Sequence, residues 1–256
     1  MCLIAWNWQP DSPCPLLLIA NRDEFYARPT AALHLWADAP LVAGRDLQAG
    51  GTWLGASLSG RVAALTNHRD PAMTRSDAPS RGELVSAFLQ GEMGAHDYLT
   101  QLSDRASRYN PFNLLVFDGR ECLGLQSHPA RVMRFMPGVG AVSNARFHTP
   151  WPKLVAIRDG LRDLLQGGGA RDADLMALLQ DRRVAADADL PVTGIAPALE
   201  RVLSARFIAT PDYGTRACSV LRLESEQISF LEHSFDARGA TGKALQRWSV
   251  ATRRVS

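Results

Sequence analysis

The class of fold is decided by the first 24 residues, which run MCLIAWNWQPDSPCPLLLIANRDE from Met1 to Glu24. Two apolar runs, 3–8 and 16–21, are separated by the turn-rich stretch 9–15. Runs of this length on either side of turn residues predict a β-hairpin at the start of the chain. Polar residues follow the second run directly, so the predicted strand carries a polar cluster to the edge of the core.

The rest of the chain continues in blocks of strands and blocks of helices. Strands are expected at 52–57, 61–66, 113–117, 122–127, 131–135, 141–143, 216–224 and 227–235. Helices are expected at 81–90, 96–106, 151–166 and 173–180, with a capping box of Ser80 and Glu83 opening the first. A surface loop is expected at 181–197. This order predicts an α+β fold of two antiparallel sheets between helical layers, and not a βαβ relay.

Length and composition indicate one globular domain. The 256 residues, 46% hydrophobic and 21% charged, predict a domain over 1–238 followed by a basic C-terminal tail over 239–256. A net charge of +2 with scattered basic residues disfavours nucleic-acid binding. The apolar runs are too short to span a bilayer, so integral membrane association is not expected. Four cysteines without a C-x-x-C pair or a leader segment predict a cytoplasmic protein without a metal site, and they leave the oligomeric state open.

Cys2 is the most distinctive candidate for chemistry. Methionine aminopeptidase removes Met1 when a small residue such as Cys follows it, which leaves a thiol and a free α-amine on one residue. The α-amine has an ordinary pKa of about 8 and can accept the thiol proton without a separate histidine. The competing interpretation is a cysteine that only packs in the first strand.

Polar residues at the ends of the predicted strands give Cys2 its context. Arg22 and Asp23 end the second strand, across the hairpin from Cys2, where a guanidinium favours the thiolate and a carboxylate can hold the α-amine. Asn67 and Asn144 each end another predicted strand, and neutral amide donors suit an oxyanion hole. Taken singly, each asparagine is also an ordinary turn residue.

Several short motifs in a fixed order resemble one known family. They are Met1-Cys2, Asn21-Arg22-Asp23-Glu24, Gly50-Gly51-Thr52-Trp53-Leu54-Gly55, Thr66-Asn67, Ser80-Arg81-Gly82-Glu83, Asn110-Pro111-Phe112-Asn113, Ser143-Asn144, Thr149-Pro150-Trp151-Pro152-Lys153 and Tyr213-Gly214-Thr215-Arg216. From Met1 to about Phe235, the chain resembles the NRDE family, also called the transport and Golgi organisation 2 family.

That family is similar to the N-terminal-nucleophile hydrolases, and the resemblance carries further expectations. It implies a four-layer αββα sandwich of two antiparallel sheets. It also implies an amidohydrolase, with no required cofactor, that attacks a linear C–N amide bond of a small molecule through a thioester on the cysteine. By position, the catalytic residues would be Cys2, Asp23, Asn67, Asn144 and Arg216, the last beside the thiolate.

One departure from the hydrolases concerns the arginine. They carry it before the Asn-x-Asp element, where this chain has Ala20, whereas Arg22 lies inside the element. Whether Arg22 reaches the sulfur is therefore open. Asn21, Arg22 and His68 are the candidates for contacts with a substrate.

Two other classes of function remain open from the sequence. The first, which the resemblance to the family implies, is a non-catalytic protein for haem or lipid binding and trafficking on the same fold, in which Cys2 or a histidine ligates haem iron. The second is a structural or interaction protein with a vestigial pocket.

Overall fold

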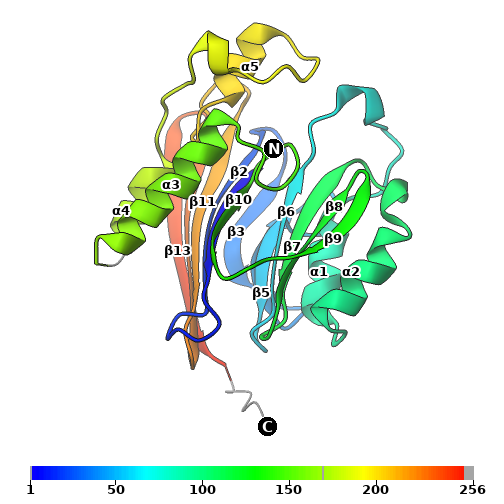
Figure 1. Cartoon of the computed structure of the whole chain (residues 1–256), viewed down its shortest axis with the longest axis vertical. Helices are drawn as coiled ribbons and strands as arrows, with labels where there is room; N and C mark the ends of the chain where they lie inside the picture. The colour runs from blue at the N-terminus through cyan, green and yellow to red at the C-terminus, as the bar shows by residue number, and fades with distance from the viewer. Residues whose placement is uncertain (1, 169, 251–256) are drawn as a thin grey trace.

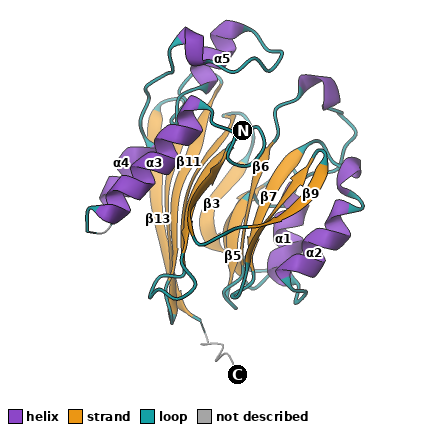
Figure 2. Ribbon diagram, viewed as in Figure 1, coloured by secondary structure: helices purple, strands orange, loops and turns teal. Residues whose placement is uncertain are grey.

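Two antiparallel β-sheets pack face to face, and helices cover the outer face of each sheet (Figures 1 and 2). The arrangement comes from a computed structural model, which describes residues 2–168 and 170–250. It is the predicted α+β fold, a four-layer αββα sandwich.

The first sheet contains the N-terminal hairpin at its centre. Its order is β10 (Gly138–Val142), β1 (Cys2–Trp8), β2 (Leu16–Phe25), β11 (Tyr213–Leu223), β12 (Gln227–Asp236) and β13 (Gly239–Ser249). β1 and β2 pair in the predicted hairpin, in a register that sets Cys2 opposite Arg22. β2 is also paired along its other edge with β11, so the polar residues at the end of β2 lie inside the sheet and not at its edge.

The second sheet supplies the other wall of the sandwich. Its order follows the chain: β3 (Thr30–Leu35), β4 (Leu41–Asp46), β5 (Leu54–Ser57), β6 (Val62–Asn67), β7 (Phe112–Phe117), β8 (Cys122–Ser127) and β9 (Ala130–Arg134). β3 and β4 were not expected from the sequence. β3 alternates between exposed and half-buried positions and buries only Leu33, so its apolar pattern is weak.

Two helices lie on each outer face. α1 (Gly82–Gln90) and α2 (Ala95–Ser103) pack on the second sheet, and α3 (Pro152–Gln166) and α4 (Asp172–Leu179) on the first (Figure 1). α3 buries Leu154, Ile157 and Leu161 on one face, which is the spacing of an amphipathic helix. A further helix, α5 (Pro197–Leu203), begins at the end of the expected surface loop. Short 3₁₀ turns lie at Pro71–Met73, Ala106–Arg108 and Asp187–Asp189.

The capping box predicted for α1 does not form. The Ser80 hydroxyl accepts a hydrogen bond from the Gly82 N–H at 3.3 Å, but the Glu83 carboxylate accepts one from the Tyr109 hydroxyl. Glu83 therefore connects α1 to the segment before β7. In a capping box, its carboxylate would instead accept a hydrogen bond from the backbone N–H of Ser80.

Three apolar layers hold the sandwich together. Along β1, Ile4 and Trp6 belong to the layer between the two sheets, whereas Leu3 and Ala5 belong to the layer under α3 and α4. A third layer lies between the second sheet and α1 and α2. Because side chains alternate along a strand, Cys2 lies on the same face of β1 as Ile4 and Trp6, toward the other sheet.

The C-terminal segment differs from the tail predicted over 239–256. Residues Gly239–Ser249 form β13, which pairs with β12 along its length and closes the first sheet. Residues 251–256 of the predicted tail lie outside the described residues. The alternating burial along β13 shows that its inner side chains contact the sandwich, which a solvated tail would not do.

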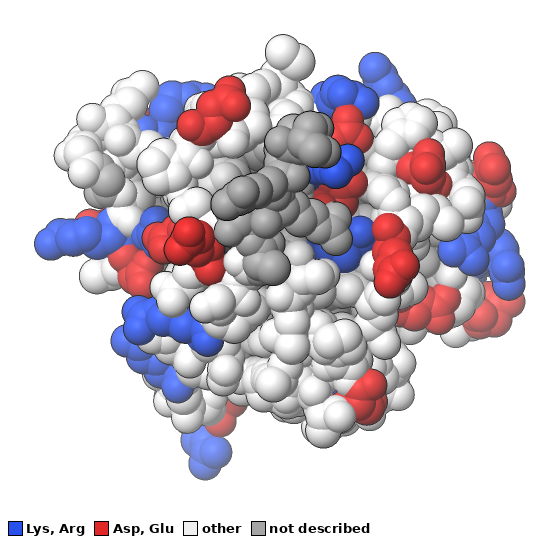
Figure 3. All heavy atoms as spheres, turned by 90° about the horizontal axis from the view of Figure 1, so that it is seen from below, with Lys and Arg blue, Asp and Glu red and all other residues white. Residues whose placement is uncertain are grey.

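Charge is mixed over the surface. On the face shown in Figure 3, acidic and basic side chains are interspersed, and no broad patch of one sign is visible there. In the part of the chain that the structure describes, no helix combines the length and the apolar character needed to cross a bilayer.

Candidate active site

A cavity of about 370 Å³ lies at the end of the sandwich where β1 begins and β6 ends. Four of the predicted site residues line it, namely Cys2, Arg22, Asp23 and Asn67. Other lining side chains are mainly polar or charged, and they include Arg28, Glu24, Asp46, Thr52, Ser80 and Arg81. The polar strand ends identified in the sequence therefore do meet at one cavity.

Cys2 lies directly across the hairpin from Arg22. Only 6% of the cysteine and 5% of the arginine are exposed to solvent. Residues opposite each other in an antiparallel pair have Cβ atoms about 5 Å apart on the same face of the sheet. Burial raises the pKa of the Cys2 thiol, and the positive charge of Arg22 acts in the opposite direction. Arg22 therefore lines the same cavity as the thiol and its charge acts on the sulfur.

Asp23 is a buried carboxyl held by the neighbouring strand. It is 1% exposed, and its Oδ1 accepts a hydrogen bond of 2.7 Å from the Thr215 hydroxyl on β11. Burial raises the pKa of Asp23, whereas the positive charge of Lys153 lowers it. A carboxylate in this position can hold a cation such as an α-amine at the start of β1.

Asn144 is oriented by a buried lysine. Its Oδ1 accepts hydrogen bonds of 3.2 Å from Lys153 Nζ and of 3.2 Å from the Ser143 hydroxyl. An ammonium group has donors and no acceptor, so the amide oxygen must face Lys153. The amide nitrogen then points the other way and donates to the Asn67 carbonyl at 3.1 Å. Asn144 therefore lies one hydrogen bond behind the cavity that Asn67 lines.

The loop that carries Asn144 is tied to the second sheet. The Thr66 hydroxyl donates to the Ser143 carbonyl at 2.6 Å, and Asn113 Nδ2 donates to the Ala145 carbonyl at 2.8 Å. These buried hydrogen bonds connect β6 and β7 to the segment that follows β10. The two sheets are thereby fixed to each other beside the cavity.

Arg216 does not have the predicted position beside the thiolate. It sits at a bulge of β11 and does not line the Cys2 cavity. Its guanidinium donates from Nη1 to the carbonyls of Phe25, Tyr26 and Arg28, and from Nε to the carbonyl of Phe235. The arginine thus fixes the turn after β2. Arg22 instead lines the cavity across the hairpin from Cys2, where its Nη1 donates to the Thr30 hydroxyl at 3.0 Å.

Asn21 and His68 are also absent from the cavity. Asn21 is fully buried on the opposite face of β2 from Arg22, and its Nδ2 donates to the carbonyls of Leu179 and Arg206 at 2.8 Å each. This follows from the alternation of side chains along a strand. His68 follows β6, and its N–H donates to the Pro111 carbonyl at 2.9 Å. Neither residue lines the Cys2 cavity.

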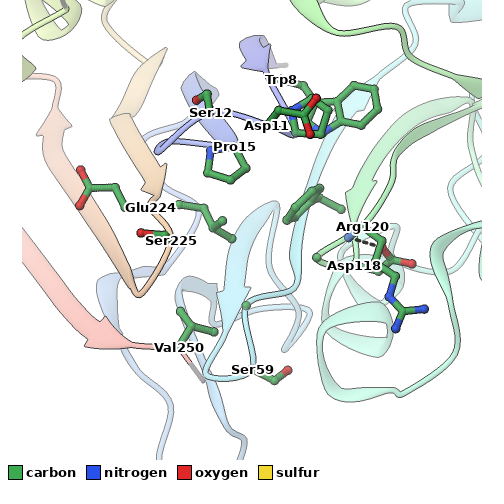
Figure 4. Close-up of a pocket in the computed structure, with 15 residues that line it drawn as sticks. Trp8, Asp11, Ser12, Pro15, Ser59, Asp118, Arg120, Glu224, Ser225 and Val250 are labelled. Atoms are coloured by element: carbon green, nitrogen blue, oxygen red, sulfur yellow. Dashed lines mark hydrogen bonds between the residues drawn. The ribbon is translucent and has the colours of Figure 1, made fainter. Parts of the chain in front are cut away.

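A second cavity of about 380 Å³ lies at the other end of the sandwich, among the turns that join the strands (Figure 4). The Asp118 carboxylate at its edge accepts hydrogen bonds from the N–H groups of Ala95, Arg120 and Glu121. It is thus used to hold a turn and the start of α2. Within residues 2–168 and 170–250, no three His, Cys, Asp or Glu side chains are grouped as metal ligands.

Comparison with known proteins identifies the family. The family model described as "Transport and Golgi organisation 2" matches residues 1–237. The chain belongs to the transport and Golgi organisation 2 family. It is 32% identical to the bovine "Transport and Golgi organization protein 2 homolog" and 31% identical to the human one, with 98% of each chain covered in both cases. These relatives confirm the family that the motifs indicated.

The solved structures show the same fold at much lower identity. A conjugated bile acid hydrolase from Clostridium perfringens is 9% identical, with a TM-score of 0.51 over the full length of both chains. This likeness supports the sandwich architecture alone.

Within this member of the transport and Golgi organisation 2 family, Lys153 and Arg81 are the site residues that the sequence did not reveal. Lys153 is 3% exposed, and burial lowers its pKa to about 8. In the sequence, Lys153 stood out only as the last residue of a family motif at the start of a predicted helix. A sharper signal was available, because Lys153 is one of two lysines in a chain that otherwise uses arginine. Arg81 lay in another family motif, at the start of α1.

Gly51 allows α1 to begin at the cavity, and we expect Gly51→Ala to displace that start. A Cβ at Gly51 would lie 2.5 Å from the carbonyl carbon of Gly82 and 2.9 Å from the Glu83 nitrogen. Both atoms are backbone, so the helix must move, at a cost of about 1 to 3 kcal/mol. Urea denaturation should show this loss. Gly242→Ala on β13 is the control, because nothing lies within 4 Å of a Cβ there. Equal stability of the two variants would contradict the expectation.

Proposed function

We propose that this protein is an N-terminal cysteine hydrolase that cleaves a linear C–N amide bond of a small molecule. The single observation that carries the proposal is the cavity in which Cys2, Arg22, Asp23 and Asn67 converge. A buried thiol that only packs has apolar neighbours, whereas Cys2 has a guanidinium opposite it and a carboxyl beside it. Perturbed titratable groups that share a cavity are typical of catalytic sites.

The proposed chemistry begins with removal of Met1. The α-amine of Cys2 takes the thiol proton, and the sulfur attacks the amide carbon of the substrate. The C–N bond then breaks, the proton passes to the leaving amine, and the acyl group remains on sulfur as a thioester. Water adds to the thioester, which releases the carboxylic acid and restores the thiol. Atoms and charge balance over the cycle without a cofactor.

Each neighbouring residue has a distinct role in this proposal. Asp23, held by Thr215, orients the α-amine. Asn67 lines the cavity and contributes to the oxyanion site, while Asn144 and Lys153 hold its backbone in place. Arg22 stabilises the thiolate. The conjugated bile acid hydrolase of similar fold was solved as its C2A mutant, in which alanine replaces the cysteine at position 2 of that protein.

The test begins with intact mass and alkylation kinetics. We expect the purified protein to lack Met1, and iodoacetamide to label Cys2 faster than Cys14, although Cys14 is the more exposed thiol. We also expect turnover of some member of a panel of linear N-acyl amides. Cys2→Ala should abolish that turnover, and Cys2→Ser should retain a remnant of it. Retention of Met1, or labelling of Cys2 no faster than that of Cys14, would rule the mechanism out.

Haem or lipid binding on the same fold stays a prediction. Clefts for such ligands are lined predominantly by apolar side chains, whereas the Cys2 cavity is lined mainly by polar ones. For this reason we place hydrolysis first. A Soret shift on haem titration that disappears in Cys2→Ala would favour the haem alternative, and a shift that is unchanged in the variant would not involve Cys2.

A further inference from the structure

Three guanidinium groups line the cavity that contains Cys2. They belong to Arg22, Arg28 and Arg81. Two of them share one carboxylate, because Asp46 Oδ2 lies 2.7 Å from Arg28 Nε and 3.8 Å from Arg22 Nη2. Hydrogen bonds from Arg28 and from backbone N–H groups keep the pKa of Asp46 below its ordinary value despite burial, so this carboxylate stays charged. The charges of Arg22 and Arg28 are therefore partly neutralised.

Arg81 is different. It is half-buried at the start of α1, and its Nη1 donates to the neutral carbonyl of Pro111 at 3.0 Å. Among the residues that the structure describes, no carboxylate forms an ion pair with its guanidinium. An arginine side chain remains protonated at neutral pH, so it carries a full positive charge into the cavity wall.

The acidic groups of the cavity do not balance this charge. Asp46 already faces two arginines. Glu24 lines the cavity and its charge acts on Arg81, but among the described residues it forms no ion pair with that guanidinium. Asp23 is already used in the proposed function, where its carboxylate holds the α-amine of Cys2. With Asp23 assigned to the α-amine, three guanidinium groups face the two carboxylates of Asp46 and Glu24, so positive charge is in excess at the cavity wall. Arg81 is the guanidinium best placed to bind an anionic group.

We propose that Arg81 selects substrates that carry an anionic group, a carboxylate in the simplest case, close to the amide bond that Cys2 attacks. The inference rests on the proposed function and adds the class of substrate. Cys2 and Arg81 are close enough for a charge on the sulfur to act on Arg81. A molecule with its amide carbon at the sulfur and its anionic group on the guanidinium would span the two walls of a cavity of about 370 Å³, which is the size of a small-molecule site.

Two alkylating reagents that differ by one charge test the inference. Iodoacetate and iodoacetamide attack a thiol through the same carbon, and only iodoacetate is anionic. We expect the rate ratio of iodoacetate to iodoacetamide at Cys2 to exceed the ratio for glutathione by about five- to tenfold at low salt, as one nearby unpaired charge would give. Arg81→Gln should bring the ratio down to that of glutathione, and Arg81→Lys should keep much of the preference.

Two controls distinguish an effect of Arg81 from the general electrostatic effect of the protein on an anionic reagent. Arg171→Gln removes an exposed arginine on the outer helical layer and should leave the ratio unchanged. In the wild-type protein, added salt should reduce the preference for iodoacetate without changing the rate with iodoacetamide. This second measurement needs no variant and tests whether the preference is electrostatic. Where Arg81→Gln does not fold, the conservative variant Arg81→Lys tests the residue itself, because loss of the whole preference in that folded variant or its absence from the wild type would contradict the proposal.

The outcomes distinguish the two proposals. If iodoacetamide labels Cys2 no faster than Cys14, the nucleophile proposed above is wrong. If iodoacetamide labels Cys2 rapidly but the ratio equals that of glutathione, the nucleophile stands and the anionic substrate class is wrong. A preference that persists in Arg81→Gln and at high salt would assign the selection to other groups and overturn the role of Arg81.

Discussion

Lys153→Met is expected to abolish a rise in stability of about 3 kcal/mol that the wild-type protein gains between pH 8 and pH 10.5. Burial lowers the pKa of Lys153 in the folded state from 10.5 to about 8. Between these values the unfolded chain binds the proton more tightly than the folded chain does. Stability from this group therefore increases as the pH rises, and the full cost of burying the charge is present below pH 8. Urea denaturation at a series of pH values measures the difference.

The chain supplies its own control for this experiment. Lys243, the second lysine, is exposed on β13, and Lys243→Met should keep the pH dependence of the wild type. The variant Lys153→Met should also free the Asn144 amide to turn, because the donor that fixes its oxygen is lost. If Lys153→Met and Lys243→Met showed the same stability profile, the buried ammonium would not be the origin of the linkage.

Much of the sandwich was predictable because local patterns and global packing agree. The runs 3–8 and 16–21 are apolar on both faces, since one face of each strand packs on the other sheet and one on the helices. Such strands are recognisable without any partner. β3 was missed because it lies at the edge of its sheet and buries little. β13 was predicted as a tail because none of its positions is fully buried and its two basic residues, Lys243 and Arg247, lie at exposed positions.

Side-chain direction explains which of the predicted site residues line the cavity. Asn21, Arg22 and Asp23 are adjacent in sequence, yet Asn21 points to the helices and Arg22 to the cavity, and the family motif alone does not separate them. The helix α5 illustrates a different limit. Its Glu200 forms a buried ion pair with Arg69, next to the end of β6. A contact between residues so far apart in the chain leaves no local pattern to read.

Two variants test whether Arg22 or Arg216 stabilises the Cys2 thiolate. We expect one to change mainly the stability of the fold and the other mainly the alkylation rate of Cys2. Arg216→Gln should destabilise the fold by about 2 to 4 kcal/mol, because the carbonyls of Phe25, Tyr26 and Arg28 lose a charged donor. The alkylation rate of Cys2 in the folded protein should stay unchanged. Arg22→Gln should instead slow alkylation at pH 7 by about three- to tenfold, since the thiolate loses the cation opposite it.

Urea denaturation and iodoacetamide kinetics on the same two samples distinguish these roles. The role that family position implies for Arg216 predicts instead that Arg216→Gln slows alkylation of Cys2. That result would mean that Arg216 leaves its carbonyl partners in solution and reaches the sulfur. The geometry opposes this, because the guanidinium would have to give up the carbonyls of the turn after β2 and that of Phe235 to move. The pairing of Cys2 with Arg22, by contrast, is built into the register of the first hairpin and needs no rearrangement.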